Sequence, residues 1–480
     1  MDPVAENKRY NTLMSNTILF AISNFSSKLL SVIAKPYLSY ALRDPGVMGV
    51  SNLIQNVGNL LIPVVSLGVS FAIIRFGLDK NTDKSSVFTN GLATIGLGFF
   101  LLILGWPLVR MIPNAAEYLV LLYLCVLMSC LRTLGTQFIR SRMLNRLVAV
   151  DGIMTSATLF GGYILYLNVF DLGATGYLLA MLTSDAISTV FVMIAGKCWR
   201  YLDFRKFSLP LWKEMLRYCV PMIPASISFW VINASDLFFV QGMCGGYGGR
   251  TGNEWAGLLS IGYFLPSIVS TLGSVFYEAW QLSAVTEETD RAAFFSRVFE
   301  VYSGVMFCCA SGIVLLCQPL LHIFKASYFD AWQFVPFLTL ASLCTCMNLF
   351  LNSVYVVFKR STSSLYTMLA GAVLNIILNY FFILRMGPNG VTPASFLSLL
   401  LVFALRAYST RGLLEIDFHL GRLAISLALV LGQIGILFRL GRAANLPNLV
   451  LTVLVIVFNR KPIVNMAQLL FGRVLRKKRV

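Results

Sequence analysis

Polar and charged side chains recur at helical spacing inside apolar segments of this sequence. The first such set consists of Asn24, Lys28, Ser31 and Lys35. Intervals of three or four residues place them on one face of a helix over 14–36. Lys28 would lie about 20 Å from the helix start, near the middle of a membrane, where a lysine costs about 2.5–3.5 kcal/mol. That cost favours a functional reason for Lys28, whereas Lys35 lies nearer the outer edge and could reach lipid headgroups.

Five further segments carry polar stripes of the same kind. A single stripe could join two helices by hydrogen bonds, but six stripes in one chain predict a shared, hydrated cavity. Arg132, inside the apolar segment 117–139, would add positive charge to it, and a cationic cavity suits a phosphate or diphosphate. The predicted cavity residues are Lys28, Lys35, Arg132, Asn24, Asn52, Asn56, Asn59, Asn348 and Asn352.

Three carboxylates in apolar segments point to a different chemistry, the binding or coupling of a cation. Asp236 and Glu278 lie near the ends of predicted helices, where they could pair with a base, meet solvent, or take part in coupling or gating. Asp185 lies within a predicted helix and stands nearly alone. A cavity for cationic drugs would need several buried carboxylates, so the sequence favours an anionic ligand.

Membrane helices must position all of these groups. Of the 480 residues, 57% are hydrophobic and 12% are charged, against about 45–50% and 25% in ordinary soluble domains. The sequence therefore predicts an all-α polytopic membrane protein with about fourteen transmembrane helices. Their expected spans are 14–36, 49–74, 88–110, 117–139, 148–168, 174–196, 217–240, 254–280, 297–321, 330–357, 363–385, 391–411, 421–438 and 446–459.

The distribution of basic residues predicts the orientation. Placing the N-terminus in the cytoplasm puts about four times as many Lys and Arg, Arg406 among them, in cytoplasmic segments as in outer ones. This bias predicts cytoplasmic N- and C-termini and accounts for the net charge of +17 without a nucleic-acid partner. The basic tail 461–480 would contact anionic lipids of the inner leaflet.

A long polar loop, 197–213, divides the chain into six predicted helices before it and eight after it. We expect two six-helix lobes, 1–200 and 201–415, followed by helices 13 and 14 in 416–460 and the basic cytoplasmic tail. The first two helices of each lobe have similar lengths, which indicates pseudo-symmetric lobes.

Motifs for cofactors and catalysis are missing from the sequence. The cysteines form no CxxC pair and the two histidines lie far apart, so we expect no metal site. The glycine-rich stretch 242–252 lacks the ending of a phosphate-binding loop and is expected to be a flexible hairpin. We therefore expect a transporter without a cofactor rather than an enzyme, driven by a Na⁺ or H⁺ gradient, the membrane potential or substrate flux.

Three stretches resemble a known family of membrane proteins. "NASDLFFVQGM" and "WAGLLSIGYFLPSIVSTLGSVFYEAWQLSAVTEE" resemble helices 7 and 8 of Wzx-type polysaccharide flippases. "LRDPGVMGVSNLIQNVGNLLIPVVSLGVSFAIIRF" resembles the opening helix pair of the same family, with Gly49 at the turn and Arg75 at the closing position. These flippases belong to the MOP exporter superfamily, together with MurJ and the MATE drug exporters.

The resemblance implies a V-shaped, two-lobed cavity with alternating access. It also implies an undecaprenyl-diphosphate-linked oligosaccharide as substrate, flipped across a bacterial cell membrane, with the polysaccharide polymerase and glycosyltransferases as further partners. Arg75 would take part in coupling or gating, and Trp280 would be an interfacial anchor. Leu237, Glu278 and Val50 depart from the family pattern, which has Arg, Gln and Tyr there, so the cationic cavity depends more on Lys28, Lys35 and Arg132.

Three other functions remain open from the sequence. A close relative could flip the peptidoglycan lipid precursor, and composition does not separate the two substrates. A cation-coupled small-molecule exporter would depend on Asp185, Asp236 or Glu278. A scaffold for polysaccharide assembly would have no use for a hydrated interior, so the polar stripes argue against it.

Overall fold

The computed structural model describes residues 33–79, 81–112, 114–220, 223–286, 291–358 and 360–477. Within these ranges the protein is helical and contains no β-strand. The chain divides into two compact units, unit 1 and unit 2, with the boundary between Trp230 and Val231. The finer division into lobes at 200/201 and 415/416 stays a proposal, as does a separate tail after 460.

Unit 1 consists of helices joined by short loops. Residues 33–41 are helical, and α10 (Ile223–Met243) contains the boundary between the units. The other elements are α2 (Pro45–Val65), α3 (Val69–Leu78), α4 (Lys84–Leu104), α5 (Trp106–Arg110), α6 (Leu119–Ser141), α7 (Asn145–Tyr163), the π-helix η1 (Ile164–Val169), α8 (Gly173–Ala195), the 3₁₀ turns η2 (Cys198–Tyr201) and η3 (Phe204–Lys206), and α9 (Leu209–Cys219).

Unit 2 is built in the same way. Its elements are η5 (Tyr247–Gly249), α11 (Gly252–Gly262), α12 (Phe264–Thr286), α13 (Arg291–Leu321), η6 (Ala326–Gln333), α14 (Val335–Val357), α15 (Ser361–Met386), η7 (Gly387–Gly390), α16 (Val391–Thr410), α17 (Leu420–Leu440), η8 (Gly441–Ala444) and α18 (Asn445–Lys477).

The predicted all-α membrane fold is confirmed. Every expected span from 49–74 to 446–459 coincides with one helix or a broken pair of helices, while most of 14–36 lies outside the described residues. Within the described ranges, 9 helical stretches are long and apolar enough to cross a membrane, or 10 with a bent pair counted as one span. One of the 9, Thr362–Thr410, contains both α15 and α16.

Several expected spans are broken rather than continuous, 49–74 and 254–280 among them. Segment 49–74 was predicted as one helix, but α2 ends at Val65 and α3 begins at Val69 after two residues with positive φ, Leu67 at 47° and Gly68 at 67°. The pair Gly252–Gly262 and Phe264–Tyr277 is bent by 40°. A periodic apolar pattern continues across both breaks, so the sequence conceals them.

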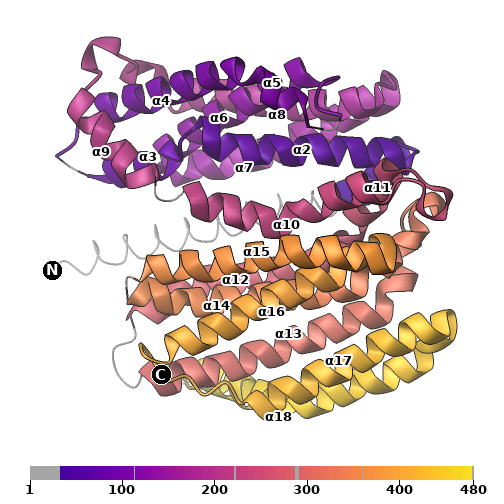
Figure 1. Cartoon of the computed structure of the whole chain (residues 1–480). Coiled ribbons are helices and arrows are strands. Elements are labelled where there is room, and N and C mark those ends of the chain that lie inside the picture. The colour runs from indigo at the N-terminus through magenta and orange to yellow at the C-terminus, as the bar shows by residue number, and fades with distance from the viewer. Residues whose placement is uncertain are drawn as a thin grey trace. The chain divides into compact units, whose positions relative to one another are not determined.

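The order of helix pairing is the same in the two units. In unit 1, α6 packs against α2 and α8, and α8 packs against α7. In unit 2, α14 packs against α12 and α16, and α16 packs against α15. Figure 1 shows these helices side by side within each unit. The repeated pairing agrees with the predicted pseudo-symmetry of the lobes.

The last two helices, α17 and α18, pack on α13 and on each other (Figure 1), and polar contacts join them. Polar contacts of this kind hold membrane helices together because lipid supplies no partner for the groups. The contacts are Glu300 with Arg422, Asn459 with Ser426, and Ser311 with Gln433 and Thr452.

Trp280 is a core residue, so its predicted role as an interfacial anchor is wrong. Its ring is only 4% exposed and stacks on Phe350, with 5.0 Å between the ring centroids. The indole N–H donates to Ser353 Oγ at 2.9 Å. The aromatic residues that surround it lie on α12, α13 and α14, helices that the sequence pattern did not bring together.

The glycine-rich stretch 242–252 connects α10 to α11, as expected of a hairpin between helices, and it packs against η6 and η7 of unit 2. Arg250 forms an ion pair with Asp330 of η6 and lies over the ring of Trp255. The ring of Tyr247 packs so closely on Gly387 that a Cβ at that glycine would lie 2.6 Å from it. Contacts to η6 and to η7, distant in sequence, order this loop.

Candidate functional site

Lys35 and the asparagine stripe of α2 come together in unit 1. Lys35 Nζ donates to Asn52 Oδ1 at 3.2 Å, while Asn52 Nδ2 donates to the carbonyl of Met48 at 2.8 Å. Asn56 Nδ2 donates to the carbonyl of Asn52, one turn earlier. Each asparagine thus donates one amide hydrogen to the helix backbone, and the Asn52 oxygen accepts from the lysine.

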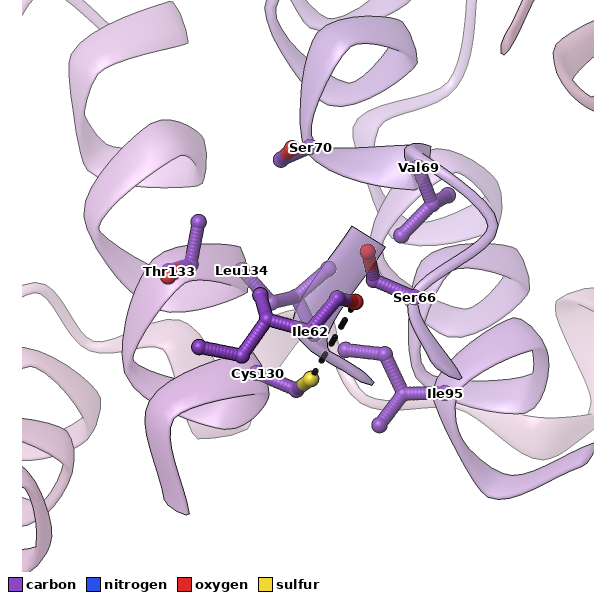
Figure 2. A pocket seen from close by; sticks show the side chains of 8 residues that line it. All are labelled: Ile62, Ser66, Val69, Ser70, Ile95, Cys130, Thr133 and Leu134. Carbon is purple, nitrogen blue, oxygen red and sulfur yellow. Dashed lines mark hydrogen bonds between the residues drawn. The ribbon is translucent and has the colours of Figure 1, made fainter. Parts of the chain in front are cut away.

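The other polar residues along α2 and α3 lie either at the surface or in a small pocket. Asn59 is exposed. Ser66 and Ser70 line a pocket at the break between α2 and α3, where Cys130 Sγ lies 3.9 Å from the carbonyl of Ile62 (Figure 2). The pocket has room for about one water molecule, so it is too small for a sugar diphosphate.

Arg132 is held in a charged cluster on α6, α7 and α8. Its NH1 lies 3.0 Å from Asp185 Oδ1, and its Nε donates to Ser188 Oγ at 3.1 Å. Ser188 donates in turn to Asp151, which is 1% exposed and also accepts from Thr136 at 3.3 Å. The sequence indicated that Asp185 stands nearly alone, but in the structure it is the direct partner of Arg132.

The charge balance of this cluster changes its expected role. One guanidinium faces two carboxylates, Asp185 directly and Asp151 through Ser188. Arg132 therefore adds no net positive charge to unit 1 when both carboxylates are ionised. Lys35, in contrast, contacts the uncharged side chain of Asn52 and keeps its positive charge uncompensated by that partner.

Arg75 stacks on an aromatic ring of α9. Its guanidinium carbon lies 4.4 Å from the centroid of the Tyr218 ring and 5.9 Å from that of Phe76. Cation–π contacts at exposed sites contribute about 0.5–1 kcal/mol. The contact joins α3, just beyond the α2–α3 break, to α9, which leads into α10. A coupling or gating role for Arg75 stays a proposal.

Asp236 is the centre of a buried polar cluster in unit 2. It is 0% exposed and lies well inside α10, whereas the sequence placed it near a helix end. Tyr263 donates to Asp236 Oδ2 at 2.7 Å, Ser395 donates to the same oxygen, and Asn379 Nδ2 donates to Oδ1 at 2.8 Å. These partners come from the α11–α12 junction, α16 and α15.

Amides complete the Asp236 cluster and leave one acceptor unused. Asn375 accepts from Asn379 at 3.1 Å and from Ser235 at 2.9 Å. Asn379 Oδ1 is buried and has no hydrogen-bond partner in the described part of the chain. A buried carboxylate held by two hydroxyl groups and an amide, with an unused amide oxygen in the same cluster, is an arrangement that can hold a monovalent cation or a proton.

Arg406 is a buried basic residue of unit 2 that was not among the predicted site residues. It was counted with the cytoplasmic segments, but it lies within α16 and is 4% exposed. Its NH1 donates to the carbonyl of Asn348 at 2.7 Å, its Nε to Thr367 at 3.2 Å and its NH2 to Ser364 at 3.0 Å. The position of Arg406 inside the expected span 391–411 was the signal that could have identified it.

The two cavity asparagines predicted on α14 lie beside this arginine. Asn348 supplies its backbone carbonyl to Arg406 and donates its side-chain amide to the carbonyl of Leu399 at 3.0 Å. Asn352 accepts from Ser364 at 2.8 Å and donates to Tyr277 Oη at 3.2 Å. The asparagines of α14 thus lie beside a basic residue, Arg406, just as Asn52 of α2 lies beside Lys35.

Three of the predicted site residues cannot be placed in this arrangement. Asn24 and Lys28 lie outside the described residues. Glu278 belongs to α12, but its side chain also lies outside the described part of the structure. Their roles stay predictions.

A family model for polysaccharide biosynthesis proteins matches residues 13–280, more than half of the chain. The chain belongs to the polysaccharide biosynthesis protein family. The match includes both polar clusters of unit 1 and, in unit 2, Asp236 and Tyr277. The family resemblance drawn from the sequence is thereby confirmed. No curated protein sequence matches the chain.

Solved structures show that this member of the polysaccharide biosynthesis protein family shares the fold of MurJ and MATE proteins. The lipid II flippase MurJ, in an inward closed conformation, aligns with a TM-score of 0.70 and 14% identity, over 95% of this chain and 100% of MurJ. An inward-facing multidrug resistance MATE transporter of the MOP superfamily gives 0.55 and 14%, over 82% and 94%. The Vibrio cholerae MATE transporter VcmN gives 0.54 and 12%, over 84% and 97%.

Proposed function

We propose that this protein is a flippase for polyprenyl-diphosphate-linked oligosaccharides. It would move the undecaprenyl-diphosphate-linked sugar from the inner to the outer leaflet of a bacterial cell membrane, with both termini in the cytoplasm. The observation that carries the proposal is the family membership together with a basic side chain against the asparagines of each unit: Lys35 contacts Asn52 of α2, and Arg406 of α16 contacts Asn348 of α14. Cationic and amide donors suit a diphosphate and the hydroxyl groups of sugars.

In this mechanism the diphosphate head enters a hydrated cavity while the polyprenyl tail stays in lipid. Alternating access of the two lobes then exposes the head on the outer side. Asp236 would couple the cycle to a Na⁺ or H⁺ gradient, since a buried carboxylate favours binding of a compensating cation. Anionic lipids would hold the basic tail, and a polymerase and glycosyltransferases would use or supply the substrate.

The test places a fluorescent polyprenyl-diphosphate oligosaccharide in one leaflet of liposomes that contain the purified protein. Exposure to an impermeant reagent in the other leaflet is followed for the wild type, Lys35→Gln and Lys28→Ala. We expect fast exposure with the wild type and at least a tenfold slower rate for each variant. Slow exposure with the wild type, equal to that of protein-free liposomes under every ion gradient, would falsify the proposal.

A second candidate substrate is the peptidoglycan lipid precursor, because a MurJ structure that carries the name lipid II flippase shares the fold over nearly its whole length. The same liposomes, loaded with that precursor, separate the two substrates. Rescue of a strain that lacks its precursor flippase, without rescue of a strain that lacks its oligosaccharide flippase, would favour this alternative.

A further inference from the structure

Arg406 is a buried guanidinium with neutral partners. Its three side-chain hydrogen bonds end on a carbonyl and two hydroxyl groups, and its side chain takes part in none of the ion pairs found in the described ranges. A charge removed from water without a counter-charge is costly. The positive charge of Arg406 therefore lacks a counter-charge within the described residues, and its field favours an anion bound nearby.

A directed chain of hydrogen bonds leads away from this guanidinium. Arginine only donates, so the direction of the chain is set at its origin. Arg406 NH2 donates to Ser364 Oγ at 3.0 Å, and Ser364 Oγ donates to Asn352 Oδ1 at 2.8 Å. Asn352 Nδ2 then donates to Tyr277 Oη at 3.2 Å. The chain crosses α16, α15, α14 and α12 in that order.

Tyr277 is the last group in this chain of hydrogen bonds, and its hydroxyl hydrogen is free to be donated. Its oxygen accepts from Asn352, so the hydroxyl hydrogen points elsewhere, and within the described residues no acceptor for it is found. Its side chain is partly exposed, in contrast to Arg406. Hydrogen bonds aligned in one direction polarise one another, so the cation at the origin makes this last hydroxyl a stronger donor.

We propose that the Tyr277 hydroxyl, backed by Ser364, Asn352 and the charge of Arg406, is a binding subsite for a phosphate or diphosphate oxygen. The subsite rests on the proposed function for its natural ligand, the diphosphate of a lipid-linked sugar. Inorganic diphosphate has the same chemistry and serves as the probe. Tyr277 touches the anion, and Arg406 acts on it through the chain and through its field.

The first experiment measures binding of inorganic diphosphate to the purified full-length protein in detergent, by titration calorimetry at fixed ionic strength. Tyr277→Phe removes the hydroxyl and keeps the ring, and Arg406→Gln removes the charge and keeps hydrogen-bonding atoms. We expect each to weaken binding about tenfold or more, since hydrogen bonds to charged groups are the strong ones. The double variant should bind diphosphate about as weakly as the single variant with the lower affinity, because both residues act through the same chain of hydrogen bonds.

The matched control is Tyr366→Phe on α15, a tyrosine that is 69% exposed. It should bind diphosphate like the wild type. Thermal unfolding of every variant checks the fold, and Tyr277→Phe decides the outcome where Arg406→Gln proves unstable. Unchanged binding in Tyr277→Phe, or no measurable binding of diphosphate by the wild type, overturns the subsite.

The second experiment repeats the leaflet-exposure assay with the same variants. Slower exposure of the lipid-linked sugar in Tyr277→Phe, parallel to the loss of diphosphate binding, supports the diphosphate of the substrate as the ligand. Tyrosine-dependent binding of free diphosphate, with no movement of any lipid-linked sugar by the wild type, keeps the subsite and rejects the proposed function. Normal flipping by Tyr277→Phe with weakened diphosphate binding rejects the lipid-linked source and leaves a free phosphate compound as ligand.

Discussion

Arg132 and Asp185 form an ion pair that joins α6 to α8, with 3.0 Å between NH1 and Oδ1. The arginine side chain is 33% exposed and the aspartate side chain 13%, so the pair lies at the edge of the packed helices. Ser188 extends the contact to Asp151. The cluster joins three helices of unit 1 to one another, so we expect a structural role for Arg132, and its role in the substrate cavity stays a prediction.

Stability measurements can test this role of Arg132. Arg132→Met leaves Asp151 and Asp185 without their cation, and we expect a loss of about 2 kcal/mol in the free energy of unfolding. Asp185→Asn should cost a similar amount, and the double variant less than the sum of the two. Thermal or denaturant unfolding in detergent measures all three. Strictly additive losses would show that the pair is not energetically coupled.

Asp236→Asn tests cation coupling in unit 2. The change removes the buried charge at nearly constant volume, so flipping should lose its dependence on a Na⁺ or H⁺ gradient. Leaflet exposure with and without each gradient is the measurement. Asp330→Asn, which breaks only the ion pair with Arg250 at the edge of unit 2, is the control and should keep the dependence. An Asp236→Asn protein that still responds to the gradient would exclude this site from coupling.

Trp280→Ala tests the aromatic core of unit 2. The indole is almost fully buried against Phe350 and donates to Ser353, so its loss should cost about 3–5 kcal/mol. Trp106→Ala, at a tryptophan that is 47% exposed, should cost far less. Melting temperatures of the two variants make the comparison. Equal losses would mean that burial does not set the importance of Trp280.

Gly98→Ala tests the close packing of α4 on the end of α2. A Cβ at Gly98 would lie 1.8 Å from the carbonyl oxygen of Val65, so the backbone has to move. We expect poor folding and a strongly lowered melting temperature. Gly96→Ala on the same helix meets nothing within 4 Å and should be neutral or stabilising by about 0.5–1 kcal/mol, since alanine is the better helix former. Similar behaviour of both variants would contradict the packing.

Most of the fold could be predicted from the periodicity of apolar residues in the sequence. The apolar runs located the helices, and a resemblance over three stretches identified the family. The break after Val65 escaped because Leu67 and Gly68 change only local dihedral angles, which leave no mark on an apolar pattern. The depth of Asp236 in α10 escaped because that helix begins at Ile223 and ends at Met243, later than the expected span 217–240.

The site was less predictable because partners on different helices decide the role of a charge. Helical spacing identified Lys35 and three asparagines. Asn52 contacts Lys35, Asn348 contacts Arg406, and Asn352 is linked to Arg406 through Ser364. Arg132 was taken as a free cation, since nothing in the sequence pairs α6 with Asp185 on α8. Arg406 was not predicted as a site residue because basic residues near helix ends are usually cytoplasmic.

The attachment of α17 and α18 to α13 has a consequence for truncated forms of the protein. Removing the chain beyond residue 415 would strip Arg422 from Glu300 and Gln433 from Ser311, and would leave that face of α13 bare toward acyl chains. An unpaired carboxylate that faces lipid is destabilising, so we expect the truncated protein to assemble poorly and to be degraded faster. A twelve-helix core of this protein is therefore not obtained by trimming alone. It needs apolar replacements at Glu300 and Ser311, which makes the last two helices an integral part of unit 2 rather than an optional extension.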